Sequence, residues 1–199
     1  MASFGNTLQV GGLRMAEVCS SPDGVEHPMP ATENPDEALF FLVLQLEGSS
    51  IHRQDERDAK LSPGDFTICA STRPYEMTRP VPGRCLVIVI PDNLMRRHLA
   101  CPDDVVAVRM AGNRGMTGVL SDFIKSFWGC RADAADPAVA LRMSYTLLDL
   151  IAAAYSVSLM RATSSRRSSP LIACESFLIS KRICAIRTST RRPWREPVK

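Results

Sequence analysis

The residue types best suited to metal binding or proton transfer are few and scattered in this 199-residue sequence. It has three histidines, His27, His52 and His98, and no two of them have the spacing of a shared metal site. His27 lies in a proline-rich segment and His52 in a charged one, so we expect each histidine to be exposed on the surface. The sequence therefore predicts no metal site and no cofactor.

Motifs for nucleophilic or phosphate chemistry are also missing. No G-x-S-x-G elbow occurs, and the glycines of residues 112–115 lack a preceding strand and a following Lys-Ser/Thr. Asp103 and Asp104 are adjacent, and such a pair in a loop usually faces water. The seven cysteines form an odd set without a C-x-x-C motif, which favours reduced thiols over a disulfide framework. We predict that the protein is not an enzyme.

Charge divides the chain into an acidic body and a basic tail. Residues 161–199 contain ten Lys or Arg and two Asp or Glu, whereas residues 1–160 contain fourteen and nineteen. We interpret residues 161–199 as a disordered tail, with out-of-frame translation as its origin, because its Ser/Arg-rich composition differs from that of the body. The alternative is a basic arm that binds nucleic-acid phosphates.

We predict that no apolar run in the sequence is long enough to span a bilayer. The first nine residues do not have the pattern of a secretion signal. We therefore expect a cytoplasmic protein with no membrane partner.

The stretch 60–90 predicts closely spaced strands. Ser62-Pro63-Gly64-Asp65 has the residues of a type II turn, and the apolar runs 66–69 and 84–90 follow it. Residues 38–46 form a further apolar strand, residues 51–60 a solvated hairpin, and residues 8–10 and 13–18 two strands joined at Gly11-Gly12. The prolines of residues 20–36 indicate a loop or an irregular edge. Short strands at this spacing predict an antiparallel sheet or barrel.

Two amphipathic helices follow the strands. Apolar residues recur with helical spacing from Met116 to Trp128, and Asp136-Pro137 begins a second helix that we expect to end near Met160. Their apolar stripes either pack on the sheet or form a dimer surface, and the sequence does not separate these possibilities. The dimer candidates are Leu120, Phe123, Phe127, Leu147 and Ile151.

Strand alternation also suggests which residues face the interior of the barrel. They would line a ligand cavity or simply fill the barrel core, and both interpretations stay open. The candidates are Phe41, Val43, Gln45, Phe66, Ile68, Tyr75 and Val87.

One set of residues resembles the cupin-like N-terminal sensor domain of AraC-type bacterial transcription regulators. The resemblance covers residues 10–160 and rests on Leu44, Leu46, Gly48, Gln54, Leu61, Pro63-Gly64-Asp65, Arg73-Pro74-Tyr75 and Ile90-Pro91. It implies an α+β fold, an antiparallel cupin-like β-barrel or sandwich followed by two amphipathic helices. Metal-using cupins carry an H-x-H pair, which His52-Arg53-Gln54 breaks, so the resemblance implies no metal.

The same resemblance implies a function for residues 1–160. They would bind a small-molecule effector and form a homodimer. Such regulators continue into a helix-turn-helix region, so we expect a chain truncated before that region, with DNA as a partner only in an intact full-length form. The alternatives are a non-catalytic interaction remnant and a small cupin enzyme.

Overall fold

The computed structural model describes residues 2–20, 23–29, 38–130 and 136–167. Residues Met1–Ser158 form one compact unit, and Leu159–Lys199 form a second. Of the second unit, residues 159–167 are described, as helix backbone. The tail predicted to be disordered otherwise lies outside the described residues.

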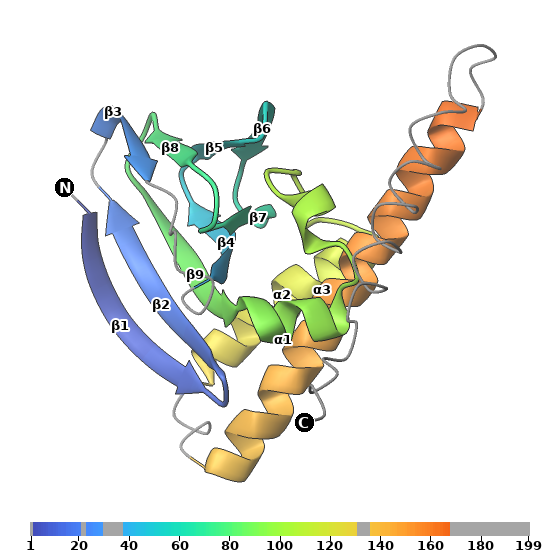
Figure 1. Cartoon of the computed structure of the whole chain (residues 1–199). Helices are drawn as coiled ribbons and strands as arrows, with labels where there is room; N and C mark the ends of the chain where they lie inside the picture. The colour runs from blue at the N-terminus through green and yellow to red at the C-terminus, as the bar shows by residue number, and fades with distance from the viewer. Residues whose placement is uncertain (1, 21–22, 30–37, 131–135, 168–199) are drawn as a thin grey trace, which may run out of the picture. The chain divides into compact units, whose positions relative to one another are not determined.

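Two antiparallel sheets form the first unit (Figure 1). The first has the strand order β1-β2-β9-β4-β7, with β1 Ala2–Val10, β2 Leu13–Ser20, β9 Gly83–Pro91, β4 Leu39–Glu47 and β7 Phe66–Ala70. The second has the order β3-β8-β5-β6, with β3 Asp23–Met29, β8 Tyr75–Arg79, β5 Ser50–Gln54 and β6 Arg57–Leu61. The predicted antiparallel cupin-like sandwich is confirmed.

The register of β4 determines which side chains share a face. Val43 is opposite Thr67 of β7 and opposite Val87 of β9. Because directly opposed residues in an antiparallel pair point to the same side, these three share the face that meets the second sheet. Leu42 and its partner Ile68 point to the other face, toward the helices.

Helices cover that other face of the first sheet. They are α1 Asp92–His98, the 3-10 turn η2 Pro102–Val105, α2 Gly115–Gly129 and α3 Pro137–Arg167. Figure 1 shows α1, α2 and α3 grouped on one side of the strands. Side chains from these helices and from the strands form one large apolar core, which includes Leu42, Leu44, Phe66, Ile68, Leu86, Ile88, Leu120, Ile124, Leu147 and Ile151.

The apolar stripes of α2 and α3 pack on the first sheet, which is one of the two arrangements that the sequence left open. Leu120, Leu147 and Ile151 have no exposed surface, and Phe127 is 8% exposed. Phe123 is partly buried against the same core. The prediction that these residues form a dimer surface is therefore wrong for the four buried ones, since the chain covers them with its own sheet.

The turn predicted at residues 62–65 is confirmed in detail. Gly64 has a φ of +89°, and the Asp65 N–H donates to the Ser62 carbonyl over 2.9 Å. Positive φ at the third position is what a type II turn requires, and glycine adopts it without strain.

Asp65 joins this turn to the segment that covers the edge strand β7. Its carboxylate accepts hydrogen bonds from the Arg109 guanidinium at 2.8 Å and from the Gly112 N–H at 3.2 Å. The backbone of Met110 exchanges hydrogen bonds with Phe66 of β7. The edge of the sheet is thereby paired rather than open to other chains.

Two segments compare differently with their expected bounds. Residues 23–29 form β3, an edge strand whose register with β8 shifts between Asp23 and His27, so the irregular edge, one of the two expectations for this segment, is confirmed. Helix α3 continues to Arg167 instead of ending near Met160, because no proline or glycine follows until Pro170. Asp136 caps α3 as predicted: its Oδ1 accepts the Ala138 N–H at 2.8 Å.

One described segment is long and apolar enough to cross a membrane, judged by length and composition alone. It is residues Pro137–Val157 of α3. The prediction that no such segment exists is therefore wrong. Its Leu147, Ile151 and Ala154 are fully buried in the core against the sheet, as expected of a core helix in a globular domain.

Candidate functional site

The candidate site is the interior between the two sheets. The first sheet contributes Phe41, Val43, Gln45, Thr67, Cys69, Cys85 and Val87, and the second contributes Ser50, His52, Tyr75 and Arg79. Contacts across the interior identify this side: the Phe41 and Tyr75 rings have centroids 6.0 Å apart, and the Cys69 Sγ lies 4.0 Å from the His52 Nδ1. In β5, Ser50 and His52 are buried while Ile51 and Arg53 on its opposite face are not.

A chain of hydrogen bonds runs from Gln45 through Ser50 to His52. The Gln45 amide nitrogen donates to the Glu47 carbonyl at 2.6 Å, which turns its Oε1 toward Ser50. The Ser50 hydroxyl donates to that oxygen at 2.7 Å, and its Oγ lies 3.0 Å from the His52 Nε2. All three side chains are at most 3% exposed. Buried polar groups of this kind are stable only when they are paired in this way.

These hydrogen bonds determine the tautomer of His52. The single Ser50 proton is used toward Gln45, so the His52 Nε2 must carry a hydrogen and donate it to Ser50. The Nδ1 is then an acceptor, directed at the Cys69 thiol. Burial, with a smaller contribution from the positive charge of Arg79, lowers the pKa of His52 to about 4, so the ring is neutral at pH 7.

The Ser50–His52 pair does not have the arrangement of an activated nucleophile. A catalytic histidine accepts the serine proton, and a carboxylate oriented on its other nitrogen stabilises the resulting charge. Here the histidine donates to the serine, and the other nitrogen faces a thiol. Burial raises the pKa of Cys69 to about 12, so this thiol is protonated and a poor nucleophile. The arrangement is suited to holding a ligand by neutral hydrogen bonds.

The interior is more open next to Phe41 and Tyr75. Phe41, Tyr75, Met77 and Val87 are only partly buried, whereas the core residues on the helix side of the same sheet are almost fully buried. Burial, as the largest cause, raises the pKa of Tyr75 to about 12, so its hydroxyl stays a hydrogen-bond donor at neutral pH. The interior thus combines accessible apolar surface with a few polar groups, as ligand sites commonly do.

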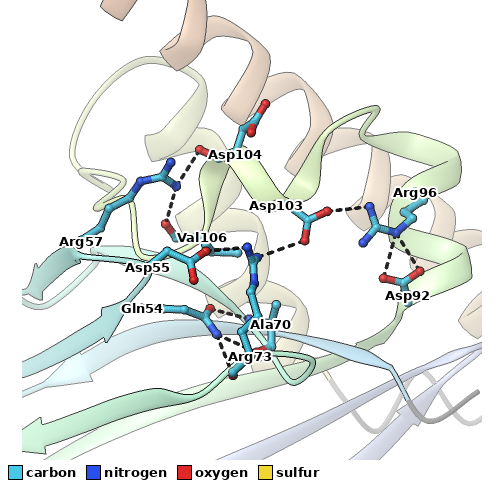
Figure 2. Close-up of polar contacts among 10 residues, drawn as sticks. All are labelled: Gln54, Asp55, Arg57, Ala70, Arg73, Asp92, Arg96, Asp103, Asp104 and Val106. Atoms are coloured by element: carbon cyan, nitrogen blue, oxygen red, sulfur yellow. Dashed lines mark hydrogen bonds and ion pairs between the residues drawn. The ribbon is translucent and has the colours of Figure 1, made fainter. Parts of the chain in front are cut away.

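Gln54 and Arg73 play a structural role at the edge of this interior, as Figure 2 shows. The Gln54 amide pairs with both the N–H and the carbonyl of Ala70, each at 2.8 Å. The Arg73 guanidinium contacts Asp55 at 2.6 Å and Asp103 at 3.0 Å, and Asp103 is shared with Arg96 of α1. These contacts fasten the β5–β6 hairpin to the helical segment that follows β9.

No cluster of three or more His, Cys, Asp or Glu side chains suited to a metal ion occurs among the residues that the structure describes. His98 contacts Asp149 of α3 through its Nδ1 at 2.8 Å, far along the chain from His52. The side chain of His27 lies outside the described residues.

Comparison with known proteins agrees with this architecture. The AraC-binding-like domain family matches residues 3–154, most of the chain. The chain belongs to this family. Its AraC-binding-like domain therefore comprises both sheets, α1, α2 and most of the core-facing part of α3.

Individual relatives of the AraC-binding-like domain are distant. A protein of Bacillus sp. (strain OxB-1), described as an uncharacterized protein in the nit 5′ region, is 28% identical over 156 residues, which are 76% of this chain and 60% of that protein. The crystal structure of the AraC-like transcriptional activator CuxR superposes with a TM-score of 0.65 at 16% identity, over 78% of this chain and 55% of that one. The chain thus spans little more than half the length of these proteins.

The structure brings together five of the seven predicted interior residues of the AraC-binding-like domain. Phe41, Val43, Gln45, Tyr75 and Val87 lie on the faces between the sheets. Phe66 and Ile68 do not, because their register with Leu44 and Leu42 turns them to the helices. Thr67 and Cys69 take their place. Whether the five bind a ligand stays a prediction.

Sequence reasoning missed Ser50, His52 and Arg79. The expectation that His52 is exposed is wrong, since its side chain is 0% exposed. The charges of residues 51–60 suggested a solvated hairpin, but β5 alternates, with Ser50, His52 and Gln54 buried between less buried neighbours. This alternation is in burial and not in residue type, because the one apolar residue of β5, Ile51, lies on the less buried face, so the sequence carried no signal for these residues.

Proposed function

We propose that this domain binds a small-molecule effector between its two sheets, as the sensing part of a transcription regulator. The family and the AraC-like activator with the same fold support a regulatory ligand-binding domain. The observation that carries the proposal is the interior itself, where partly exposed Phe41, Tyr75 and Val87 lie beside the buried Gln45–Ser50–His52 chain.

Binding without catalysis fits the chemistry of these groups better than an enzyme does. His52 is neutral and donates to Ser50, and Cys69 is a protonated thiol. Such groups orient a ligand by hydrogen bonds but supply neither a base nor an activated nucleophile. The proposal therefore assigns no reaction to this interior.

The wider role belongs to the same proposal. The chain covers 55% of the length of the AraC-like activator it resembles, so DNA binding is proposed only for an intact regulator that contains such a domain. A homodimer and a cytoplasmic location are likewise proposed on the resemblance to regulators of this type.

A thermal-shift screen of the full chain tests effector binding. We expect some compound in a panel of small aromatic and aliphatic molecules, near a hundredfold excess over its Kd, to raise the Tm by roughly 5–10 °C. Val87→Trp, which fills the interior, should remove the shift. Val119→Trp is the control, because Val119 is 51% exposed on α2. The proposal is wrong if no compound stabilises the chain or if Val87→Trp responds like wild type.

A further inference from the structure

Arg79 is an unusual residue in this interior. It is the last residue of β8, and its side chain is 8% exposed. Its positive charge lowers the pKa of His52 on one sheet and of Cys85 on the other, although burial, the largest effect, raises the pKa of Cys85 overall. Geometry agrees: Arg79 shares a face of β8 with Met77, the strand partner of His52, and with Tyr75, whose ring contacts Phe41, so its side chain points between the sheets.

The described side chains around Arg79 do not neutralise its charge. Among the side chains that the structure describes, none forms an ion pair or a hydrogen bond with Arg79. The polar residues of the interior, Gln45, Ser50, His52, Tyr75 and Cys85, are all uncharged at neutral pH. A buried cation without a counter-ion is unfavourable, and proteins normally pair such charges.

We propose that the effector carries a carboxylate, which Arg79 binds inside the sandwich, with an apolar body that packs on Phe41, Tyr75 and Val87. This rests on the proposed effector site and names its ligand class. A guanidinium presents two parallel N–H donors that match a carboxylate, and such charge-assisted bonds are stronger than neutral ones. The carboxylate would supply the missing negative charge. The neutral neighbours would accept the apolar remainder of the ligand.

Asp23 is one residue that could supply the charge from within the chain. Its Cα is the partner of Arg79 in the β3–β8 register. The experiment must therefore separate an internal ion pair from a ligand site.

Matched acid and amide pairs provide the probe: benzoate against benzamide, and octanoate against octanamide. Thermal shifts of the full chain are measured with each compound at low and high KCl. We expect a carboxylate to stabilise the wild type and its amide to bind roughly ten- to hundredfold more weakly. The preference should persist at high salt, because a buried ion pair is little screened, whereas binding to surface cations should weaken.

Three variants complete the test. Arg79→Gln should remove the preference for acids. If no acidic side chain of the chain pairs with Arg79, the ligand-free Tm should stay unchanged or rise, because the variant deletes a buried charge. Arg79→Lys keeps the charge without the two-pronged geometry and should retain a reduced preference. Arg53→Gln is the matched control, because Arg53 is on the opposite face of the same sheet, beside Asp58 and Glu76, with a 40% exposed side chain. It should behave like wild type.

The results distinguish the two proposals. If amides stabilise the chain as well as acids do, or if Arg79→Gln retains the preference, the carboxylate inference is wrong while the effector site stands. Two outcomes would show that Arg79 forms an ion pair within the chain, and either would make the inference wrong. One is that Asp23→Asn binds acids in preference to amides while the wild type does not. The other is that Arg79→Gln lowers the ligand-free Tm. If no compound of either kind binds, the carboxylate inference is wrong, and if the wider panel of the thermal-shift screen also fails, the effector site itself is overturned.

Discussion

At the scale of single residues, His52 shows how the surroundings set the chemistry of a side chain. A histidine in water changes charge near pH 6.5, but this one is fully buried and keeps its proton on Nε2 to reach Ser50. Charging it would place a cation next to the positive Arg79 in a site without a described carboxylate. The interior is therefore built around the neutral ring.

This burial predicts a pH dependence of stability. The pKa of His52 is about 4 in the folded chain, below the 6.5 of an exposed histidine, so the unfolded chain binds more protons between these values. Stability should be complete above pH 6.5 and should fall as the pH drops toward 4, by roughly 3 kcal/mol at most. Urea unfolding of the wild type and of His52→Gln between about pH 4 and pH 6.5 measures this change in unfolding free energy. Equal pH slopes in the two proteins would contradict the assignment.

At the scale of elements, the turn at residues 62–65 organises more than its two strands. Asp65 is 4% exposed and connects the turn to Arg109 and Gly112, and the Ser121 hydroxyl of α2 donates to the Gly64 carbonyl at 2.8 Å. The turn thus positions the segment that pairs with β7 and the start of the helical layer. A short motif that looks local in sequence holds two layers of the fold together.

Removal of this carboxylate should destabilise the whole first unit. Asp65→Ala leaves the Arg109 guanidinium and the Ser62 and Gly112 N–H groups without their acceptor, for a loss of about 2–4 kcal/mol. Asp122→Ala is the control: Asp122 pairs with Lys125 on the surface and is 74% exposed, so we expect a change within about 0.5 kcal/mol. Chemical denaturation measures both, and equal losses would refute this role of Asp65.

At the scale of the whole molecule, the helical layer belongs to the core of this domain. Its inward residues, such as Leu147 and Ile151, are packed against the strands, while Leu141 and Tyr145 of α3 remain 46% and 47% exposed. A homodimer stays a prediction. If a dimer forms through α3, its contacts must be made by the exposed Leu141 and Tyr145 and not by the buried Leu147 and Ile151.

Two substitutions separate folding from association. Leu147→Ala should cost about 2–5 kcal/mol of unfolding free energy, because it leaves a cavity in the core. Leu141→Ser should change stability by less than about 1 kcal/mol. Light scattering of the full chain across a concentration series then measures the mass of each. If α3 forms a dimer, Leu141→Ser weakens it; a dimer that is unaffected by Leu141→Ser rules out this face.

Much of the fold could be predicted from local sequence. The residues of 62–65 specify their turn because Gly64 can adopt positive φ at no cost, and the spacing of Met116 to Trp128 specifies a helix. For β3 the sequence left a loop and an irregular edge open, because its prolines and weak pattern do not choose between them, and pairing with β8 decided for the edge strand.

The sequence by itself determined the strands, the helices and the scarcity of catalytic groups, since these depend on residue type and on spacing along one element. Only the tertiary structure decided which face of each element is inside. Phe66 and Ile68 turned to the helices, and His52 and Arg79 to the interior, because register and packing between distant strands set those directions. The electrostatic character of the interior follows from that assembly, because burial and neighbouring charges arise only once the two sheets meet.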